Sequence, residues 1–493
     1  MKIAFITLGC KLNFAETATY ERGFRAAGLE VVPWREKADI YLINTCTVTE
    51  TSNKKSRGEI RKVHRINPDA KIIVTGCYAQ MKPDEVRAID GVARVFMAKE
   101  KNLVVPETLD LVFRQELPLE DVSTPGESTP KSGSFSGAPL FGQGEGPVGC
   151  ELSGEESLLS KTDDDADNGR GRSERIAGPP QICDLWGARS ERSSDRGSYL
   201  PEHVFGAYST SERTRAFLKV QDGCDNFCRY CTVPYARGRS RSIPICEAVK
   251  AAEAIATDEV KEVVITGVNT GDYGRGTNES FLDLLKALNA VEGIERWRIS
   301  SIEPNLITEE IIDWIASGTK FQPHFHIPLQ QGTDTILSRM GRKYTTAFFA
   351  DRIAYIRSRM EGPGKPRVFF GIDVMAGLPG ETEELFQQEI EFLKEIRPAF
   401  IHVFPYSKRP GTPAATMPDQ VSEQVKAERV ARLEELCKIL HDEFVEANRG
   451  IREKVIFESK EKDGTMGGYT GNYIRVTRPY DAALVGKLTE VTI

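Results

Sequence analysis

The 493-residue sequence has no apolar run long enough to cross a bilayer, and its first residues are strand-like rather than those of a signal peptide. It also lacks an excess of basic residues, since 65 Lys and Arg stand against 72 Asp and Glu, for a net charge of −7. These absences predict a cytoplasmic protein with no membrane association. They argue against a uniformly basic nucleic-acid binder, although a local basic patch is enough to bind phosphates.

Composition is otherwise typical of a soluble globular protein, with 40% hydrophobic and 28% charged residues. The chain is long enough for two to four domains. It contains 10 cysteines, and three of them are tightly clustered. Such clustering in a chain of this size favours thiolate ligands in a reducing compartment over a disulfide framework.

The clustered cysteines are Cys224, Cys228 and Cys231, spaced C-x3-C-x2-C in a short loop after a strand-like run at 216–220. No fourth Cys or His lies close by. A structural zinc ion needs four protein ligands, whereas a [4Fe–4S] cluster can use three thiolates and leave one iron open. The spacing therefore favours an iron–sulfur cluster, with a zinc site completed by a distant ligand as the alternative.

The first hundred residues alternate apolar runs with amphipathic stretches, which predicts a parallel sheet wound with helices. The expected strands are 3–8, 40–43, 72–75 and 92–97, with helices near 15–27 and 51–66. Cys10, Cys46 and Cys77 each follow one of these strands. Because the carboxyl ends of parallel strands share one edge, the three cysteines are expected to meet there. The alternative for each is a buried apolar cysteine.

The amino-acid composition changes between residues 115 and 208. This segment is rich in Ser, Gly, Pro and charged residues, contains an acidic run at 163–167 and shows no sustained periodicity. Such a composition buries too little apolar surface to offset its chain entropy. We predict a low-complexity, disordered insertion.

Strand-like and helix-like segments alternate regularly after the clustered cysteines. Expected strands lie at 216–220, 262–266, 297–302, 324–329, 367–375 and 400–404. Six βα units predict an open, partial (β/α) barrel with its functional loops at the carboxyl ends of the strands. A long helix at 422–448, with an apolar stripe typical of core packing, closes this domain.

The last forty residues show short strand patterns at 454–458, 473–477 and 488–492, broken by glycines, which predicts a small antiparallel β-barrel. The overall prediction is an α/β protein of three folded domains and one insertion. Its expected boundaries are 1–114, 115–208, 209–448 and 449–493.

Particular motifs carry a resemblance to a known family. Cys224, Cys228, Tyr230 and Cys231 form the pattern C-x3-C-x-aromatic-C, which resembles the radical S-adenosylmethionine (SAM) enzymes. The continuation PYARGRSRS and the N-terminal motifs GCKLNFAET, INTCTVT and VTGCYAQ resemble the methylthiotransferase branch. The resemblance implies two [4Fe–4S] clusters, an auxiliary one on the first three cysteines and a SAM-cleaving one on the loop.

By the same resemblance, one SAM methylates a sulfur held at the auxiliary cluster and a second yields the 5′-deoxyadenosyl radical. The cysteines fix and tune the clusters, and no other catalytic residue is assigned. Candidate SAM contacts follow the barrel strands: Tyr230, Thr266, Gly267, Asn269, Glu303, His326, Gln330 and Gln331. Glycine-rich turns also end many strands for steric reasons, and His326 is equally interpretable as a hydrogen-bonded core histidine.

The C-terminal segment resembles the short RNA-binding β-domain (TRAM) of tRNA methylthiotransferases. The expected RNA contacts are Tyr469, Tyr473, Arg475 and Arg478 there, and Arg237, Arg239 and Arg241 after the cluster loop. A solvated surface of mixed charge is the alternative for the first group. Carboxylate partners within the barrel are the alternative for the second.

The motifs GCKLNFAET, YCTVPYARGRSRS and FPYSKRPGTPAA resemble most the family members that act on N6-threonylcarbamoyladenosine. This resemblance implies methylthiolation at C2 of that nucleoside at tRNA position 37. The expected partners are tRNA and an electron donor such as flavodoxin or ferredoxin, and the expected state is a monomer. Alternatives are the isopentenyladenosine substrate, a ribosomal-protein aspartate, another sulfur-insertion activity, and a non-enzymatic metal-binding protein associated with RNA.

Overall fold

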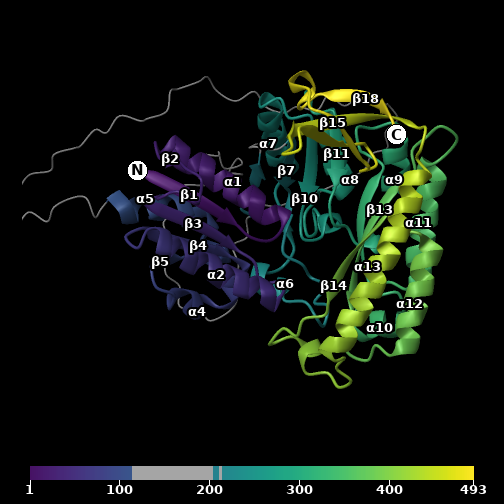
Figure 1. The fold of residues 1–493 in the computed structure, drawn as a ribbon, viewed down its shortest axis with the longest axis horizontal. Coiled ribbons are helices and arrows are strands. Elements are labelled where there is room, and N and C mark those ends of the chain that lie inside the picture. Colours follow the sequence, from purple (N-terminus) through teal and green to yellow (C-terminus); the bar gives the residue numbers. More distant parts are fainter. Residues whose placement is uncertain (114–203, 210–213) are drawn as a thin grey trace, which may run out of the picture. The chain divides into compact units, whose positions relative to one another are not determined.

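The computed structural model describes residues 1–113, 204–209 and 214–493, which all belong to one compact unit (Figure 1). The predicted insertion lies outside the described residues except at its end. Val204 and Phe205 are already packed, and the Phe205 ring stacks on Tyr20 with 5.3 Å between centroids. Residues 204–208, which the prediction assigns to the insertion, are therefore packed against the folded domains where the structure describes them.

The N-terminal domain is a five-stranded parallel sheet of order β2-β1-β3-β4-β5. Its central strand β3 is buried along its whole length, as expected for a strand covered on both faces. Its strands are β1 (Lys2–Thr7), β2 (Glu30–Val31), β3 (Ile40–Thr45), β4 (Lys71–Gly76) and β5 (Val92–Val95). Its helices are α1 (Lys11–Ala26), α2 (Glu50–Ile66), α3 (Cys77–Met81), α4 (Pro83–Arg87) and α5 (Val104–Phe113).

The central domain contains the six predicted parallel strands, arranged as an incomplete barrel. Two sheets share the strands, in the orders β11-β10-β7-β6 and β12-β13-β14, and a parallel bridge from Trp297 to Phe321 links them. These strands are β7 (Arg215–Lys219), β10 (Glu262–Thr266), β11 (Arg296–Ile299), β12 (His324–Gln330), β13 (Phe369–Ala376) and β14 (Phe400–Pro405). An unpredicted strand, β6 (Ala207–Ser209), pairs antiparallel with β7.

Helices cover the outer face of the barrel strands, and α11, α12 and α13 run along β13 and β14 in Figure 1. They bury Leu, Ile and Phe side chains of one large core. The helices are α6 (Val233–Arg237), α7 (Ile245–Thr257), α8 (Phe281–Ala290), α9 (Glu309–Ala316), α10 (Asp334–Arg339), α11 (Thr346–Met360), α12 (Glu383–Ile396) and α13 (Glu423–Glu446). Near the predicted cluster loop, β8 (Gln221–Asp222) pairs with β9 (Arg241–Ser242).

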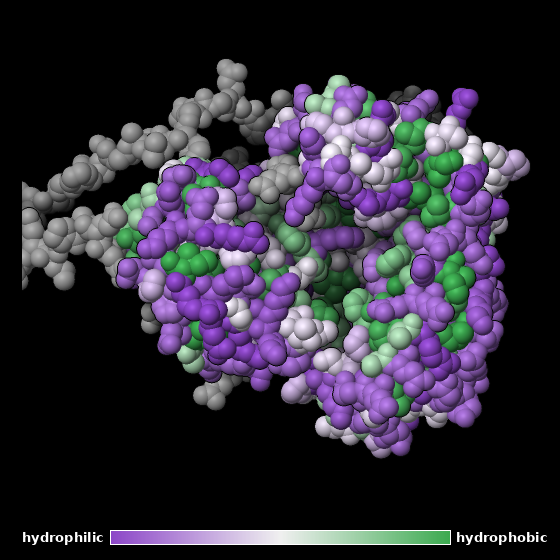
Figure 2. Space-filling model, in the orientation of Figure 1, coloured by the Kyte–Doolittle hydropathy of each residue, from purple (hydrophilic) through white to green (hydrophobic). Residues whose placement is uncertain are grey.

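The C-terminal domain is an antiparallel half-barrel of order β17-β16-β15-β18. Its strands are β15 (Arg452–Lys460), β16 (Thr465–Tyr469), β17 (Arg475–Pro479) and β18 (Leu488–Thr492). Of the helices described, none is long and apolar enough to span a membrane. Figure 2 shows a deep hollow in the middle of the drawn face, with polar and apolar residues at its rim.

Candidate functional site

Three cysteines converge at the carboxyl edge of the N-terminal sheet. Cys10 follows β1, Cys46 follows β3, and Cys77 begins α3 directly after β4. Burial, together with nearby Cys10 and Cys46, raises the pKa of the Cys77 thiol to about 11. Gly9 has φ of +103° and lies so close to β3 that an added Cβ would be 3.0 Å from Cys46 Sγ. A glycine before Cys10 therefore permits this close approach of β1 to Cys46.

The second trio, Cys224, Cys228 and Cys231, lies in the loop between β8 and α6. The Cys231 amide donates to the Cys228 carbonyl at 2.9 Å, which closes the loop into a tight turn. The Val233 amide points at Cys231 Sγ from 3.4 Å, an arrangement that favours a thiolate. Burial nevertheless raises the pKa of Cys231 to about 12. A positively charged metal group would supply the missing stabilisation.

Both trios fit a cluster of several irons better than a single zinc ion. Zn–S bonds of about 2.3 Å in a tetrahedron place thiolate sulfurs about 3.8 Å apart. Neither trio has all three sulfurs within 4.8 Å of one another, among the residues that the structure describes. In a [4Fe–4S] cluster each thiolate binds a different iron, so the sulfurs lie farther apart.

Arg342 was not identified from the sequence and lies directly against the second trio. Its guanidinium donates to Cys228 Sγ at 3.1 Å and to Glu303 Oε1 at 2.7 Å. It also donates to the hydroxyls of Tyr344 and Tyr230, at 2.8 and 3.4 Å. Nothing in the linear sequence links Arg342 to a loop that ends more than a hundred residues earlier, although its position just after α10 places it at a strand-end loop.

The candidate SAM contacts fall into two groups. Tyr230, Glu303 and Asn269 form one connected set beside the cysteine loop, since Arg342 bonds to Tyr230 and Glu303, and Asn269 Oδ1 accepts from the Glu303 amide at 3.2 Å. Asn269 Nδ2 is buried without a partner in the described chain. These three side chains remain our proposed SAM contacts.

The other candidates are mostly engaged by the protein itself. Thr266 is fully buried and donates to a carbonyl of β7. A Cβ at Gly267 would lie 2.8 Å from Gln221 Oε1, so this glycine permits close packing. Gln331 is buried and its Oε1 accepts two bonds from Thr333. Gln330 has a left-handed φ of +72°, an unusual conformation for a non-glycine residue that favours a constrained site.

Arg237 is a structural residue rather than an exposed phosphate contact. It is 4% exposed, and its guanidinium bonds to Glu16 Oε1 at 3.3 Å and to Asp222 Oδ1 at 3.0 Å. It also donates to Asn13 Oδ1 at 2.5 Å, in the helix that follows Cys10. RNA cannot reach a guanidinium that is buried and fully paired, so we leave Arg237 out of the proposed RNA contacts. Arg241 is half-buried and bonds to the Arg237 and Arg239 carbonyls.

Arg239 is the exposed member of this basic group, with its side chain 75% exposed. Its guanidinium lies 4.9 Å from the ring of Phe227, which is itself 43% exposed and packs edge-on against Tyr235. Phe227 adopts a left-handed φ of +47° directly before Cys228. Neither Phe227 nor Tyr235 was predicted from the sequence to contact RNA, although an exposed ring beside an arginine is a typical platform for nucleobases.

The four C-terminal candidates lie on or beside β16 and β17. Tyr469 and Tyr473 stack on each other, with 4.7 Å between centroids, and the Arg215 guanidinium lies over both rings. These tyrosines thus join the half-barrel to β7. Arg475 and Arg478 are exposed, and Arg475 pairs with Glu461.

Two family profiles match the chain. Residues 2–98 match "Uncharacterized protein family UPF0004", and residues 218–393 match "Radical SAM superfamily". Among solved structures, TsrM from Kitasatospora setae, a radical SAM methyltransferase, superimposes with a TM-score of 0.51 at 15% identity. That match covers 84% of this chain and 74% of TsrM, and at this identity it shows a shared fold.

Curated relatives match over the full length. The threonylcarbamoyladenosine tRNA methylthiotransferase MtaB of Bacillus subtilis is 36% identical over all of this chain and 93% of its own length. The protein of the same name in Aquifex aeolicus is 33% identical over the full length of both chains. A tRNA-2-methylthio-N(6)-dimethylallyladenosine synthase of Carboxydothermus hydrogenoformans is 28% identical, over 99% of this chain and 95% of its own. The chain therefore belongs to the radical SAM methylthiotransferases, enzymes that use SAM and a [4Fe–4S] cluster.

Proposed function

We propose that this enzyme methylthiolates C2 of N6-threonylcarbamoyladenosine at position 37 of tRNA, beside the anticodon. The observation that carries the proposal is the full-length similarity to relatives named for that nucleoside, at 36% and 33% identity. The relative named for the dimethylallyl nucleoside is less similar, at 28%.

We propose two [4Fe–4S] sites, one on Cys10, Cys46 and Cys77 and the other on Cys224, Cys228 and Cys231. When bound, the clusters and SAM supply a methylated sulfur and a 5′-deoxyadenosyl radical. The protein contributes thiolates on rigid strand ends for the first site and on a tight loop for the second. This division of labour explains why one chain needs two separate trios.

The residues around the second trio fix the cysteine loop and offer polar groups that position SAM. Arg342 bonds both to Cys228 Sγ and to Glu303, so it ties the cysteine loop to the strand end that carries Glu303. A hydrogen bond to a cluster-ligating sulfur stabilises its negative charge. Asn269 supplies an unpaired amide beside this pair, suited to a polar group of SAM.

The proposed RNA contacts are Arg239, Arg475 and Arg478, with the exposed ring of Phe227 beside Arg239. Sequence-specific RNA recognition commonly targets loops whose bases are splayed out and stacked on aromatic rings. Phe227 immediately precedes a cysteine of the second trio, so a base stacked there would lie next to that site. Tyr469 and Tyr473 are packed together, and we propose that they support the C-terminal surface that carries Arg475 and Arg478.

We further propose a cytoplasmic monomer that receives electrons from a flavodoxin or ferredoxin. A single chain supplies all six cysteines, so no described part of either site requires a second copy. Size-exclusion chromatography with light scattering measures the oligomeric state, and reduction of the reconstituted protein by each donor identifies the electron source.

The proposal is tested by mass spectrometry of nucleosides from tRNA of a host that lacks this activity, with and without the expressed protein. We expect 2-methylthio-N6-threonylcarbamoyladenosine to appear only with the protein. Methylthiolation of the isopentenyl nucleoside alone would overturn the substrate while leaving the reaction. Absence of any methylthio nucleoside would overturn a tRNA substrate.

A further inference from the structure

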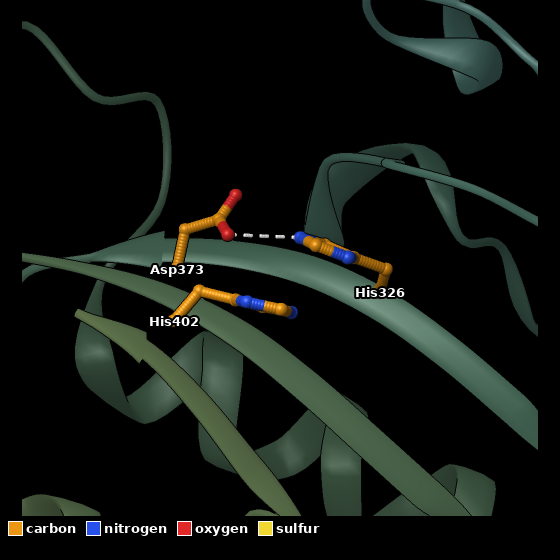
Figure 3. A group of neighbouring side chains, drawn as sticks. All are labelled: His326, Asp373 and His402. Atoms are coloured by element: carbon orange, nitrogen blue, oxygen red, sulfur yellow. Dashed lines mark hydrogen bonds and ion pairs between the residues drawn. The ribbon is translucent and has the colours of Figure 1, made fainter. Parts of the chain in front are cut away.

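A group of polar side chains lies on the barrel strands β12, β13 and β14, outside both cysteine trios. His326, Asp373 and His402 project from adjacent strands toward one another (Figure 3). Their ligand atoms all lie within 4.8 Å, and His326 Nε2 is 2.9 Å from Asp373 Oδ1. The side chains of His326 and Asp373 are each about one-fifth exposed. The group is therefore partly accessible to a ligand.

Two histidines and a carboxylate are a common ligand set for a metal ion, but the ring geometry does not favour one. A metal bound to an imidazole lies in the plane of the ring, along the nitrogen lone pair. The planes of His326 and His402 differ by 10°, and the rings are stacked with centroids 5.1 Å apart. Lone pairs in two stacked, parallel rings do not converge on one point.

The unused hydrogen-bond donors of the group indicate an anionic ligand instead. Asp373 is its one carboxylate, and it is shared by His326, by His402 and by the nearby ammonium of Lys11. Lys11 has no hydrogen bond or salt bridge to a described residue. Burial would raise the pKa of Asp373, but the bond from His326 and the charge of its neighbours lower it, so this carboxylate is ionised. The Lys11 ammonium is therefore a donor that no described side chain accepts from, beside a carboxylate that is already bonded to His326.

Chain neighbours and hydrogen bonds connect the group to both trios. Lys11 follows Cys10 in the chain. At the other side, His326 is two residues before Pro328, whose carbonyl accepts from Tyr344, a partner of Arg342. Arg342 in turn bonds to Cys228. A ligand bound by His326, His402 and Lys11 is thereby placed near both sites.

We infer that Lys11, His326, Asp373 and His402 form the pocket for the threonylcarbamoyl side chain of the substrate nucleoside. Lys11 and His402 donate to its carboxylate, and the His326–Asp373 pair accepts a hydrogen bond from its hydroxyl. This inference rests on the proposed function and adds the residues that select the substrate. An isopentenyl group offers neither a charge nor a hydroxyl, so it would leave the donors of Lys11 and His402 without a partner.

The test uses the reconstituted full-length enzyme and two anticodon stem-loop RNAs. One carries N6-threonylcarbamoyladenosine, and the other carries its methyl ester, which lacks the negative charge. The variants are His402→Gln and Lys11→Met, with His441→Gln as the matched control because His441 lies on α13, outside the group. Methylthio product, RNA binding and RNA-independent 5′-deoxyadenosine formation are measured for each. The last readout and the iron content report whether a variant is folded and loaded.

We expect the wild type and His441→Gln to prefer the acid over the ester by at least about tenfold in kcat/KM. His402→Gln and Lys11→Met lose most of that preference, through KM for the acid, while 5′-deoxyadenosine formation is retained. An unchanged preference in both variants overturns the inference, as does an equal loss on both RNAs. A stoichiometric metal ion that is lost only in His402→Gln also overturns it. If the wild type modifies neither RNA, the proposed function itself fails, and the inference with it.

Discussion

Replacement of Glu16 by Gln tests the buried ion network that joins α1 to the cysteine loop. The Glu16 carboxylate is 1% exposed and lies within 2.7 Å of Lys101 Nζ, 2.6 Å of Lys219 Nζ and 3.3 Å of Arg237 Nη1. All three cations are buried as well. Only one other carboxylate, Asp222, contacts all three of these cations in the described chain.

The magnitude follows from the burial of this network. Loss of one partner from a buried ion pair costs about 3–5 kcal/mol, because the remaining charge is left without compensation. Burial alone would raise the pKa of Glu16, but Lys101, Lys219 and Arg237 hold it well below its usual range. The carboxylate is therefore ionised at neutral pH, and its stabilising contribution is lost only as the pH falls toward that lowered pKa.

The assay is urea unfolding of the metal-free protein, followed by fluorescence and circular dichroism. The unfolding free energy falls by about 3 kcal/mol per molar urea, so a loss of about 3–5 kcal/mol lowers the urea midpoint of the first unfolding transition by about 1 to 1.7 M. The matched control is Glu21→Gln on the same helix, whose partner Arg25 is 55% exposed. That surface pair contributes about 0–1 kcal/mol. Equal midpoints for the two variants would refute the assigned role of the network.

Three other predictions concern the reaction and the RNA. Cys10→Ala is expected to keep 5′-deoxyadenosine formation while losing methylthio product, and Cys228→Ala to lose both; product from Cys10→Ala would contradict the cluster assignment. Arg342→Lys keeps the charge but loses the guanidinium fork, so we expect slower SAM cleavage with unchanged RNA affinity. Arg239→Gln removes one exposed phosphate contact and should lower the salt slope of RNA binding by about 0.7, whereas Arg359→Gln on the outer helix α11 should not.

The sequence predicted which segments form strands better than it predicted the contacts between distant segments. Alternating apolar runs predicted all six parallel barrel strands because each strand has its own local pattern. It missed β16, whose Gly467 and Gly468 weaken any strand pattern. Gly468 is nevertheless required there, because an added Cβ would meet the Ile456 backbone of the paired strand.

Long-range electrostatics could not be predicted in the same way. The spacing of Arg237, Arg239 and Arg241 predicts a basic patch, yet Arg237 pairs with Glu16, 221 residues away in sequence. Two arginines that are close in sequence therefore differ in environment: Arg237 is buried in an ion network, and Arg239 is exposed beside Phe227. The cysteines were different, since strand ends of a parallel sheet meet by topology alone.

The most direct test of the central claim uses the reconstituted enzyme, stem-loop RNA carrying N6-threonylcarbamoyladenosine, and SAM with a deuterated methyl group. We predict a product nucleoside that carries the deuterated methyl on sulfur at C2, with 5′-deoxyadenosine formed in equal amount. Formation of 5′-deoxyadenosine without any methylthio group on this RNA, or a product lacking the deuterium label, would contradict it.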